Sequence, residues 1–224
     1  MIKSITYQKN YMRKFHLILL IVLLFQLSII SCRNSSDEVA IGNQVWMAEN
    51  LDVDKFRNGD PIPHAKTEEE WLNAYRNEEP AWCYYENDSI NGEKYGKLYN
   101  MFAVKDRRGL APEGWRIPSD TDWTVLTDYL EGDLFAGGKM KSTGTQFWKT
   151  PNSGASNESG FSGLPGGFRY NNGLFGKIGL NGYWWSAYIS NEDSRDLALN
   201  YYSGEVEREN FNEGQGLSVR CIRK

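Results

Sequence analysis

The fold is decided first by residues 39–47, whose sequence is VAIGNQVWM. Apolar side chains occupy odd-numbered positions on both sides of a Gly-Asn pair: Val39, Ile41, Val45 and Met47. A Gly-Asn pair between two such runs is typical of a tight β-hairpin, because it tolerates the positive φ angles of a two-residue turn. We therefore expect a hairpin here, with the odd-numbered side chains on a single inward face.

Helix signals follow in the first half of the chain. Thr67 with Glu70, and more weakly Ser119 with Asp122, match the capping box in which two side chains satisfy backbone N–H groups at a helix start. Apolar residues follow each box at helical spacing, so each box is predicted to begin an amphipathic helix. Residues 98–104, LYNMFAV, are expected to form a third, short helix.

Strand signals dominate the second half, where long Gly-rich loops are also expected. Leu197, Leu199 and Tyr201 alternate with smaller or polar residues, which predicts a half-buried strand. Ser203-Gly204 would turn the chain back into a neighbouring strand, and residues 217–221 alternate as a terminal strand. Helices early and strands late indicate the α+β class, with short twisted antiparallel sheets and two or three helices.

Residues 1–31 differ in character from the rest of the chain. Basic residues precede an apolar run over 15–30, and Ser31-Cys32 follows it; the basic residues are Lys3, Lys9, Arg13 and Lys14. These are the parts of a secretory signal peptide. An uncleaved membrane anchor is the alternative, although the run is shorter than the ~20 residues that a spanning helix needs. Both interpretations place the remaining chain outside the cytoplasm.

The end of this segment resembles the lipobox of bacterial lipoproteins. The resemblance rests on Ile29-Ile30-Ser31-Cys32 and implies that Cys32 receives the lipid and becomes the mature N-terminus. Residues 32–38 would then be a short polar tether, and residues 39–224 a single domain held at the outer membrane or cell surface.

Charge and cysteine content restrict the function further. The whole chain has a net charge of −4, and the basic leading segment makes the remainder more acidic still, which argues against a nucleic-acid partner. With Cys32 committed to lipid, Cys83 and Cys221 remain as an even pair in an oxidising compartment, so we expect a disulfide between them. Two buried free thiols are the alternative. Neither cysteine has the close neighbours of a zinc site.

Six ordered blocks carry a resemblance to a known family. They are residues 41–51 (IGNQVWMAENL), 95–100 (YGKLYN), 114–120 (GWRIPSD), 160–169 (GFSGLPGGFR), 182–186 (GYWWS) and 218–221 (SVRC). Together they resemble the Fibrobacter succinogenes major paralogous domain family over residues 39–224. The resemblance implies a C-type-lectin-like fold whose N- and C-terminal strands are adjacent. It also implies a core rich in tryptophan: Trp46, Trp115, Trp123 and Trp185.

One departure from the family pattern concerns the cysteines. Many members resembling this chain have cysteine just before the Pro-x-Gly-Trp block, where Ala111 stands here. If the cysteine of the terminal strand ordinarily pairs at that position, the resemblance leaves Cys83 as the partner of Cys221.

Catalytic and metal-binding residues are scarce. His64 is the one histidine outside the leading segment, so the chain offers a single candidate for histidine-dependent catalysis, and we do not expect such a site. The family that this chain resembles is similar in fold to formylglycine-generating enzymes, but Cys83 and Cys221 do not match the paired active-site cysteines of those enzymes. Asn157-Glu158 offers too few oxygen ligands for calcium, which prefers six to eight, although a calcium ion at this loop stays an alternative. We therefore predict a protein that is not an enzyme and has no metal site.

The remaining prediction is a binding module for a glycan or a protein. Residues 186–216 combine aromatic and adaptable polar side chains, as antibody paratopes do, and Tyr183 with Trp184 could add a platform for sugars. The candidate ligand-binding residues are Tyr183, Trp184, Tyr188, Asn191, Arg195, Asn200, Tyr202 and Arg208. They could equally be ordinary residues of strands and turns. A structural or adhesion protein of the envelope, or a degenerate formylglycine-generating-type enzyme, are the alternative functions.

Overall fold

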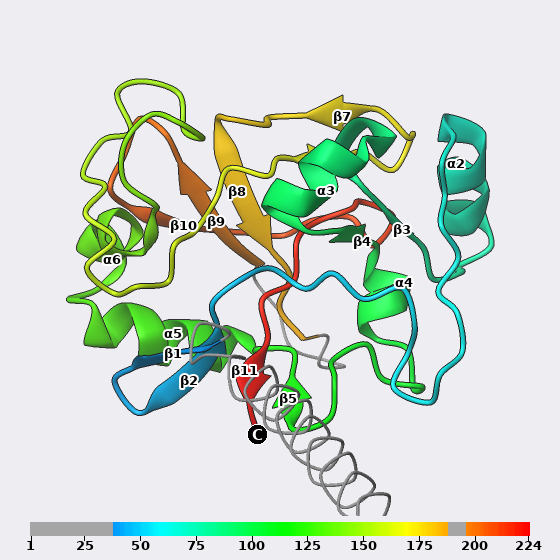
Figure 1. Ribbon diagram of the computed structural model, residues 1–224, viewed down its shortest axis with the longest axis horizontal. Coiled ribbons are helices and arrows are strands. Elements are labelled where there is room, and N and C mark those ends of the chain that lie inside the picture. Colours follow the sequence, from blue (N-terminus) through cyan, green and yellow to red (C-terminus); the bar gives the residue numbers. More distant parts are fainter. Residues whose placement is uncertain (1–37, 188–195) are drawn as a thin grey trace, which may run out of the picture. The chain divides into compact units, whose positions relative to one another are not determined.

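The opening hairpin is confirmed in the computed structural model, which describes residues 38–187 and 196–224 (Figure 1). Strands β1 (Glu38–Ile41) and β2 (Gln44–Met47) pair antiparallel, and Gly42 in the turn has a φ of 59°. The predicted single inward face is wrong. A two-residue turn pairs Val39 with Trp46, so odd positions of β1 share a face with even positions of β2. The domain has two large buried hydrophobic clusters, and β2 contacts both of them. Trp46 belongs to one cluster, and Val45 on the opposite face of the strand packs against the other.

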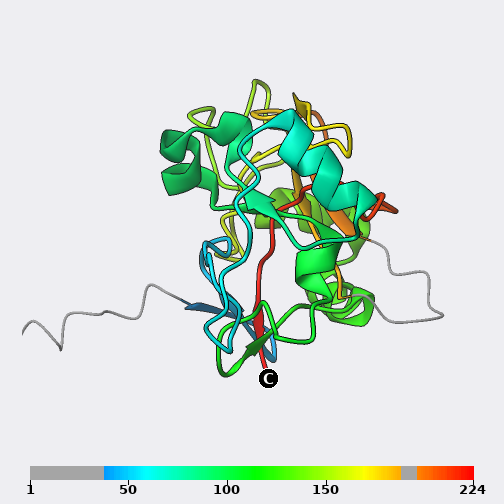
Figure 2. The same ribbon diagram turned by 90° about the vertical axis from the view of Figure 1, so that its right-hand side faces the viewer.

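The two ends of the domain meet in one sheet, as predicted. Strand β11 (Ile222–Arg223) lies between β2 and β5 (Trp115–Arg116), in the order β1-β2-β11-β5. Figure 2 shows β11 running down beside the opening strands. The contact continues above the sheet, because the N–H of Leu51 donates to the carbonyl of Val219 at 2.8 Å. The terminal strand β11 starts later than the predicted residues 217–221, of which Leu217 and Ser218 form single β-bridges with Tyr99 and Trp184.

A second sheet contains the predicted hairpin of the C-terminal half. Its order is β10 (Val206–Glu209), β9 (Asp196–Asn200) and β8 (Asn181–Trp184), all antiparallel. All five residues of β9 are buried, so the predicted half-burial is wrong. The reason is that Ala198 packs into one core region while Leu197 and Leu199 pack into the other.

Both predicted capping boxes are present. Thr67 and Glu70 cap α2 (Glu68–Arg76), which buries Trp71 and Ala74; Ser119 and Asp122 cap α5 (Asp120–Tyr129), which buries Trp123 and Leu126. The helix predicted over residues 98–104 is wrong in its first part. Leu98–Tyr99 form β4, paired with β3 (Trp82–Cys83), and only Met101–Val104 form a helix, α4.

Several short elements have no counterpart in the predictions. They are the 3₁₀ turn η1 (Tyr85–Asn87), α3 (Ser89–Tyr95), α6 (Asp133–Met140), β6 (Phe168–Arg169) and β7 (Phe175–Gly176). Helix α6 contains two glycines because it lies directly on other backbone segments. A Cβ atom on Gly138 would lie 2.3 Å from the carbonyl oxygen of Gly154, and one on Gly137 would lie 2.4 Å from that of Glu205.

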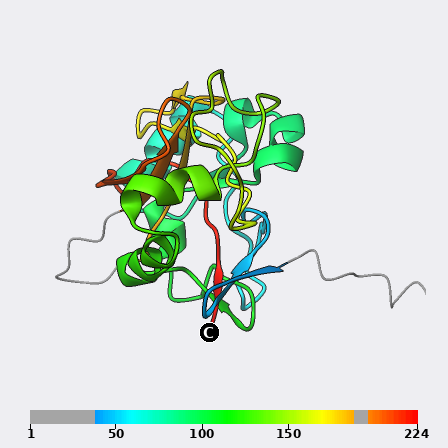
Figure 3. The same cartoon turned by 90° about the vertical axis from the view of Figure 1, so that its left-hand side faces the viewer.

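The tryptophan core is confirmed, and with it the α+β class. Trp46 and Trp123 stack with ring centroids 4.6 Å apart, and Phe161 lies edge-on to both. Trp115 and Trp185 belong to the neighbouring buried cluster. Residues Glu38–Lys224 form one compact unit, with helices and short sheets around this interior (Figure 3).

The predicted disulfide is wrong. Cys83 on β3 and Cys221 next to β11 are both buried free thiols in separate core clusters, and burial raises the pKa of each to about 12. The even number of cysteines therefore does not indicate a disulfide, because each thiol packs at its own position in the core. Within residues 38–187 and 196–224, no helix is both long enough and apolar enough to span a membrane.

Candidate functional site

The predicted ligand-binding residues are not one surface. Tyr188, Asn191 and Arg195 lie outside the described residues, as does the proposed lipid site Cys32. Tyr183 and Trp184 are buried in the core, so they do not form the predicted stacking platform for sugars. Their strand, β8, is covered on both sides and turns its aromatic rings inward.

The other candidates of the 186–216 segment stabilise the second sheet. The side chain of buried Asn200 accepts hydrogen bonds from the N–H groups of Tyr202 and Ser203 and so shapes the β9–β10 turn. The guanidinium group of Arg208 lies 3.4 Å from the carboxylate of Asp120 on α5. Tyr202 is 59% exposed and is the one described candidate with an exposed aromatic ring, which packs edge-on against Tyr201.

A cavity lies on a different side of the domain, between the loop after β2 and helix α3. Its volume is about 430 Å³, within the range of roughly 300–1,000 Å³ typical of small-molecule sites. Four separate parts of the chain supply the walls and Arg220 supplies part of the floor. The lining residues are Ala48, Glu49, Asn50, Asp52, Gly92, Glu93, Lys94, Tyr95, Gly96, Ser142, Phe147, Ser162, Leu164 and Arg220.

Arg220 is the buried anchor of this cavity, with 1% of its surface exposed. Its Nη1 donates to the carbonyl oxygens of Met47, Ala48 and Phe161 at 2.7–3.1 Å, and its Cζ lies 4.5 Å from the Phe161 ring centroid. Its Nε donates to Oδ1 of Asn50 at 3.0 Å. These bonds join the last segment of the chain to the loop after β2 and fix the guanidinium orientation.

Asn50 connects the floor to the core and to the cavity wall. Its Oδ1 also accepts from Nε1 of Trp184 at 2.8 Å, and its Nδ2 donates to the carbonyl of Tyr95 at 2.9 Å. The amide oxygen thus accepts two donors and cannot swing into the cavity without leaving both unpaired. Such a fixed amide is a positioning group, which holds Arg220 and the wall at Tyr95 in place.

The charge of Arg220 has no carboxylate partner. Its guanidinium forms no ion pair within the described part of the chain, and burial lowers its pKa to about 9. The nearby negative charge of Glu49 opposes this lowering of the pKa. A buried cation without a counter-charge costs stability. Arg169 is likewise buried and held by backbone carbonyls, so what distinguishes Arg220 is that it lines a cavity.

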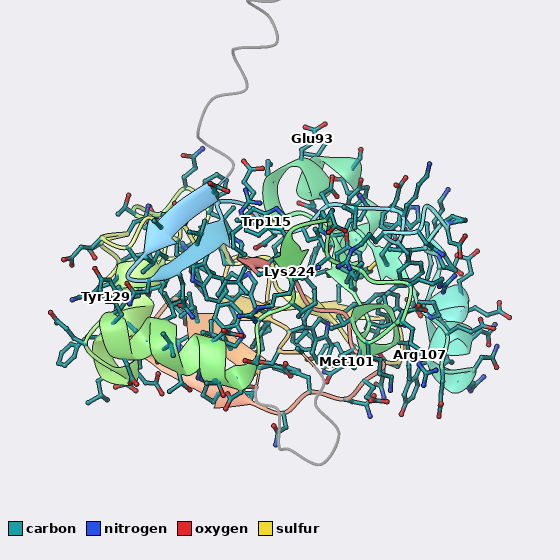
Figure 4. The ribbon with its side chains drawn as sticks, turned by 90° about the horizontal axis from the view of Figure 1, so that it is seen from below. Glu93, Met101, Arg107, Trp115, Tyr129 and Lys224 are labelled. Atoms are coloured by element: carbon teal, nitrogen blue, oxygen red, sulfur yellow. The ribbon has the colours of Figure 1, made fainter. Side chains whose placement is uncertain are left out.

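The walls combine an aromatic pair with acidic side chains. The rings of Tyr95 and Phe147 meet edge-to-face, with centroids 6.3 Å apart. Asp52 forms an ion pair with buried Lys97. The ammonium group of Lys97 also lies over the rings of Trp82 and Tyr84. Glu93 also lines the cavity, and Figure 4 shows its side chain projecting outward from α3.

The remaining candidates for chemistry are engaged elsewhere. His64 stacks on Trp82 with ring centroids 3.8 Å apart, and burial lowers its pKa. Asn157, once considered for calcium, exchanges two hydrogen bonds with Ser162, and the carboxylate of Glu158 faces Lys139 at 3.9 Å. Among the residues that can be described, no group of three metal-ligating side chains occurs.

The sequence did contain a signal for this cavity. Glu49, Asn50, Tyr95, Ser162 and Arg220 all belong to the blocks that carry the family resemblance. The individual predictions missed them because the blocks were interpreted as fold determinants, and Arg220 meets Asn50 across a separation of 170 positions.

The fold and the cavity together define an α+β domain, closed by its own terminal strands, with a small-molecule-sized cavity over a buried arginine. The chain belongs to the family described as the Fibrobacter succinogenes major domain, whose profile matches residues 39–223. No curated protein matches the chain, and no solved structure does so.

Proposed function

We propose that this chain is an exported, non-catalytic binding module, held at the envelope by a lipid on Cys32, whose ligand occupies the cavity over Arg220. The observation that carries the proposal is an open cavity lined by a buried guanidinium that is oriented by four hydrogen bonds and has no carboxylate partner in the described residues. Ligand sites ordinarily consist of a preformed hollow with a few oriented polar groups, and this hollow matches that description.

Binding is favoured over catalysis by the chemistry at the cavity. Its polar groups are an arginine, an asparagine, hydroxyls and carboxylates, and neither cysteine nor His64 lines it. Both thiols have a pKa raised to about 12, so neither forms a nucleophilic thiolate at neutral pH.

The proposed lipid anchor makes a direct prediction. Substituting Cys32→Ala should move the protein from the membrane fraction to the soluble fraction and abolish palmitate labelling, because no acyl chain would remain to partition into the bilayer. Cys83→Ala is the matched control and should leave both properties unchanged. Palmitate labelling that persists in Cys32→Ala would contradict the lipoprotein assignment.

A structural or adhesion role is the second candidate, and one surface favours it. Four large apolar side chains are exposed on α5 and α6: Val125, Tyr129, Leu134 and Phe135. Leu134 is 67% exposed, and Tyr129 projects from the edge of the domain in Figure 4. Neighbouring exposed apolar residues of this kind are typical of protein contacts.

One experiment separates the two candidates. The mature chain would be applied to a glycan array and used in parallel as bait for envelope proteins. Saturable binding that is lost on altering the cavity supports the binding module. A protein partner whose capture depends on Leu134 and Phe135, and not on the cavity, supports the structural role instead.

A further inference from the structure

Arg220 brings an uncommitted donor to the cavity. Its Nε and Nη1 make all of its hydrogen bonds to Asn50 and to the three carbonyl oxygens, whereas Nη2 donates none of them. A guanidinium group has five N–H donors, so the two on Nη2 remain for a ligand. Because the other bonds fix the plane of the group, the direction of these donors is set before a ligand arrives.

Glu49 supplies an acceptor in the same cavity. It is exposed and immediately precedes Asn50, and its negative charge acts to raise the pKa of Arg220, yet the two do not form an ion pair in the described structure. A ligand group that accepts from Nη2 and donates to the carboxylate would satisfy both. Hydroxyl groups do both at once, and vicinal hydroxyls can do so at adjacent positions.

Phe147 supplies an apolar surface next to these polar groups. It is half-buried, lines the cavity and is braced edge-on by Tyr95. The C–H face of a sugar ring packs on such an aromatic ring while its hydroxyls reach polar neighbours, because the aromatic face is apolar and carries partial negative charge.

The charges of the cavity lining balance. Glu49 and Glu93 carry two negative charges, Lys94 and Arg220 carry two positive charges, and the charge of Asp52 is compensated by Lys97. An anionic ligand bound next to Glu49 would meet a like charge. A neutral polyhydroxylated ligand keeps the balance and satisfies both the donor and the acceptor.

We propose that the cavity binds one neutral sugar residue, with hydroxyls between Nη2 of Arg220 and the carboxylate of Glu49, and with its ring face on Phe147. This inference rests on the proposed binding function and specifies its ligand class. A volume of about 430 Å³ accommodates one ring of a longer glycan, whose remainder would extend past the rim at Glu93.

The test measures binding of single sugars to the mature chain by titration calorimetry. The neutral arm contains glucose, galactose, mannose and N-acetylglucosamine, and the acidic arm contains glucuronic acid and N-acetylneuraminic acid. We expect at least one neutral sugar to bind and the acidic sugars to bind at least tenfold more weakly.

Variants then assign the contacts. Glu49→Gln should weaken binding by about tenfold, because the charged acceptor is lost while the shape is kept. Phe147→Leu should weaken it by a similar factor through loss of the ring. Glu113→Gln, an exposed carboxylate outside the cavity, should have no effect. Unchanged thermal unfolding in all three variants shows that the fold is intact.

Each contrary result has a distinct meaning. Binding of acidic sugars alone, or full affinity in Glu49→Gln, would overturn the assignment of a neutral sugar while leaving a ligand cavity. Binding of a peptide or protein in this cavity with no sugar bound would do the same. The absence of any cavity-dependent ligand would overturn the proposed function itself.

Discussion

Replacing Trp184 by alanine is expected to lower the free energy of unfolding by about 3–5 kcal/mol, the usual cost of removing a fully buried tryptophan. Trp184 has 0% of its surface exposed and packs edge-on to Phe161, with ring centroids 5.7 Å apart. Its loss would also free one acceptor position on Asn50. Chemical denaturation followed by circular dichroism measures the change.

Trp184→Phe is the matched control for this substitution. It keeps an aromatic ring but removes the indole hydrogen bond to Asn50 and part of the buried ring volume, so we expect a smaller loss of roughly 2 kcal/mol. If Trp184→Ala instead kept the stability of the native protein and lost only ligand binding, Trp184 would be a surface residue of the binding site and the core described above would be incorrect.

Lys141→Met is expected to destabilise the domain by about 3 kcal/mol at pH 7, because leaving three buried backbone acceptors without a donor costs more than removing the buried charge gains. The ammonium group of Lys141 is fully buried and donates to the carbonyl oxygens of Ser153, Asn200 and Ser203 at 2.7–2.9 Å. These bonds fasten the segment after α6 to the β9–β10 turn. A variant as stable as the native protein would show that the three carbonyls find other partners.

The same lysine gives a dependence on pH whose sign can be stated. Burial lowers the pKa of Lys141 to about 8 from 10.5, so the unfolded chain binds the proton more tightly than the folded one. The penalty is fully present below pH 8 and is relieved as pH rises toward 10.5. The native protein should therefore gain stability relative to Lys141→Met across this window, by up to about 3 kcal/mol. An unchanging difference between the two proteins would contradict the lowered pKa.

Local patterns were sufficient to predict several parts of the fold. Gly42-Asn43 predicted the hairpin, and Thr67 and Ser119 predicted two helix starts. These motifs could be recognised because a turn or a helix cap depends only on backbone groups a few residues away. The burial of Trp46 and Trp123 followed from residue type and from the family resemblance. These features depend little on distant parts of the chain.

Features that depend on distant contacts could not be predicted in this way. Asp196 and Asn200 are polar, yet both are buried because they accept backbone N–H groups from Ser186 and from the following turn. Their type alone suggested a solvent-facing side of β9. The number of cysteines likewise gives no information about the distance between them, and Cys83 and Cys221 belong to different buried clusters.

The ligand-binding prediction failed for a related reason. Composition shows that aromatic and polar residues are present, but it does not show the direction in which Tyr183 or Asn200 points. The cavity itself is assembled from segments that lie far apart in the sequence, and only the fold brings Phe147 and Arg220 to the same space.

The occupancy of the cavity over Arg220 can be measured directly by nuclear magnetic resonance. Indole and backbone N–H signals of the ¹⁵N-labelled mature chain would be followed while neutral sugars are added. We expect the signal of Trp184, whose indole bonds to Asn50 at the cavity floor, to shift with saturation, and that of Trp71, bonded to Gly214, to stay fixed. Shifts confined to Tyr202 and the β9–β10 turn, with Trp184 unchanged, would contradict the cavity as the binding site.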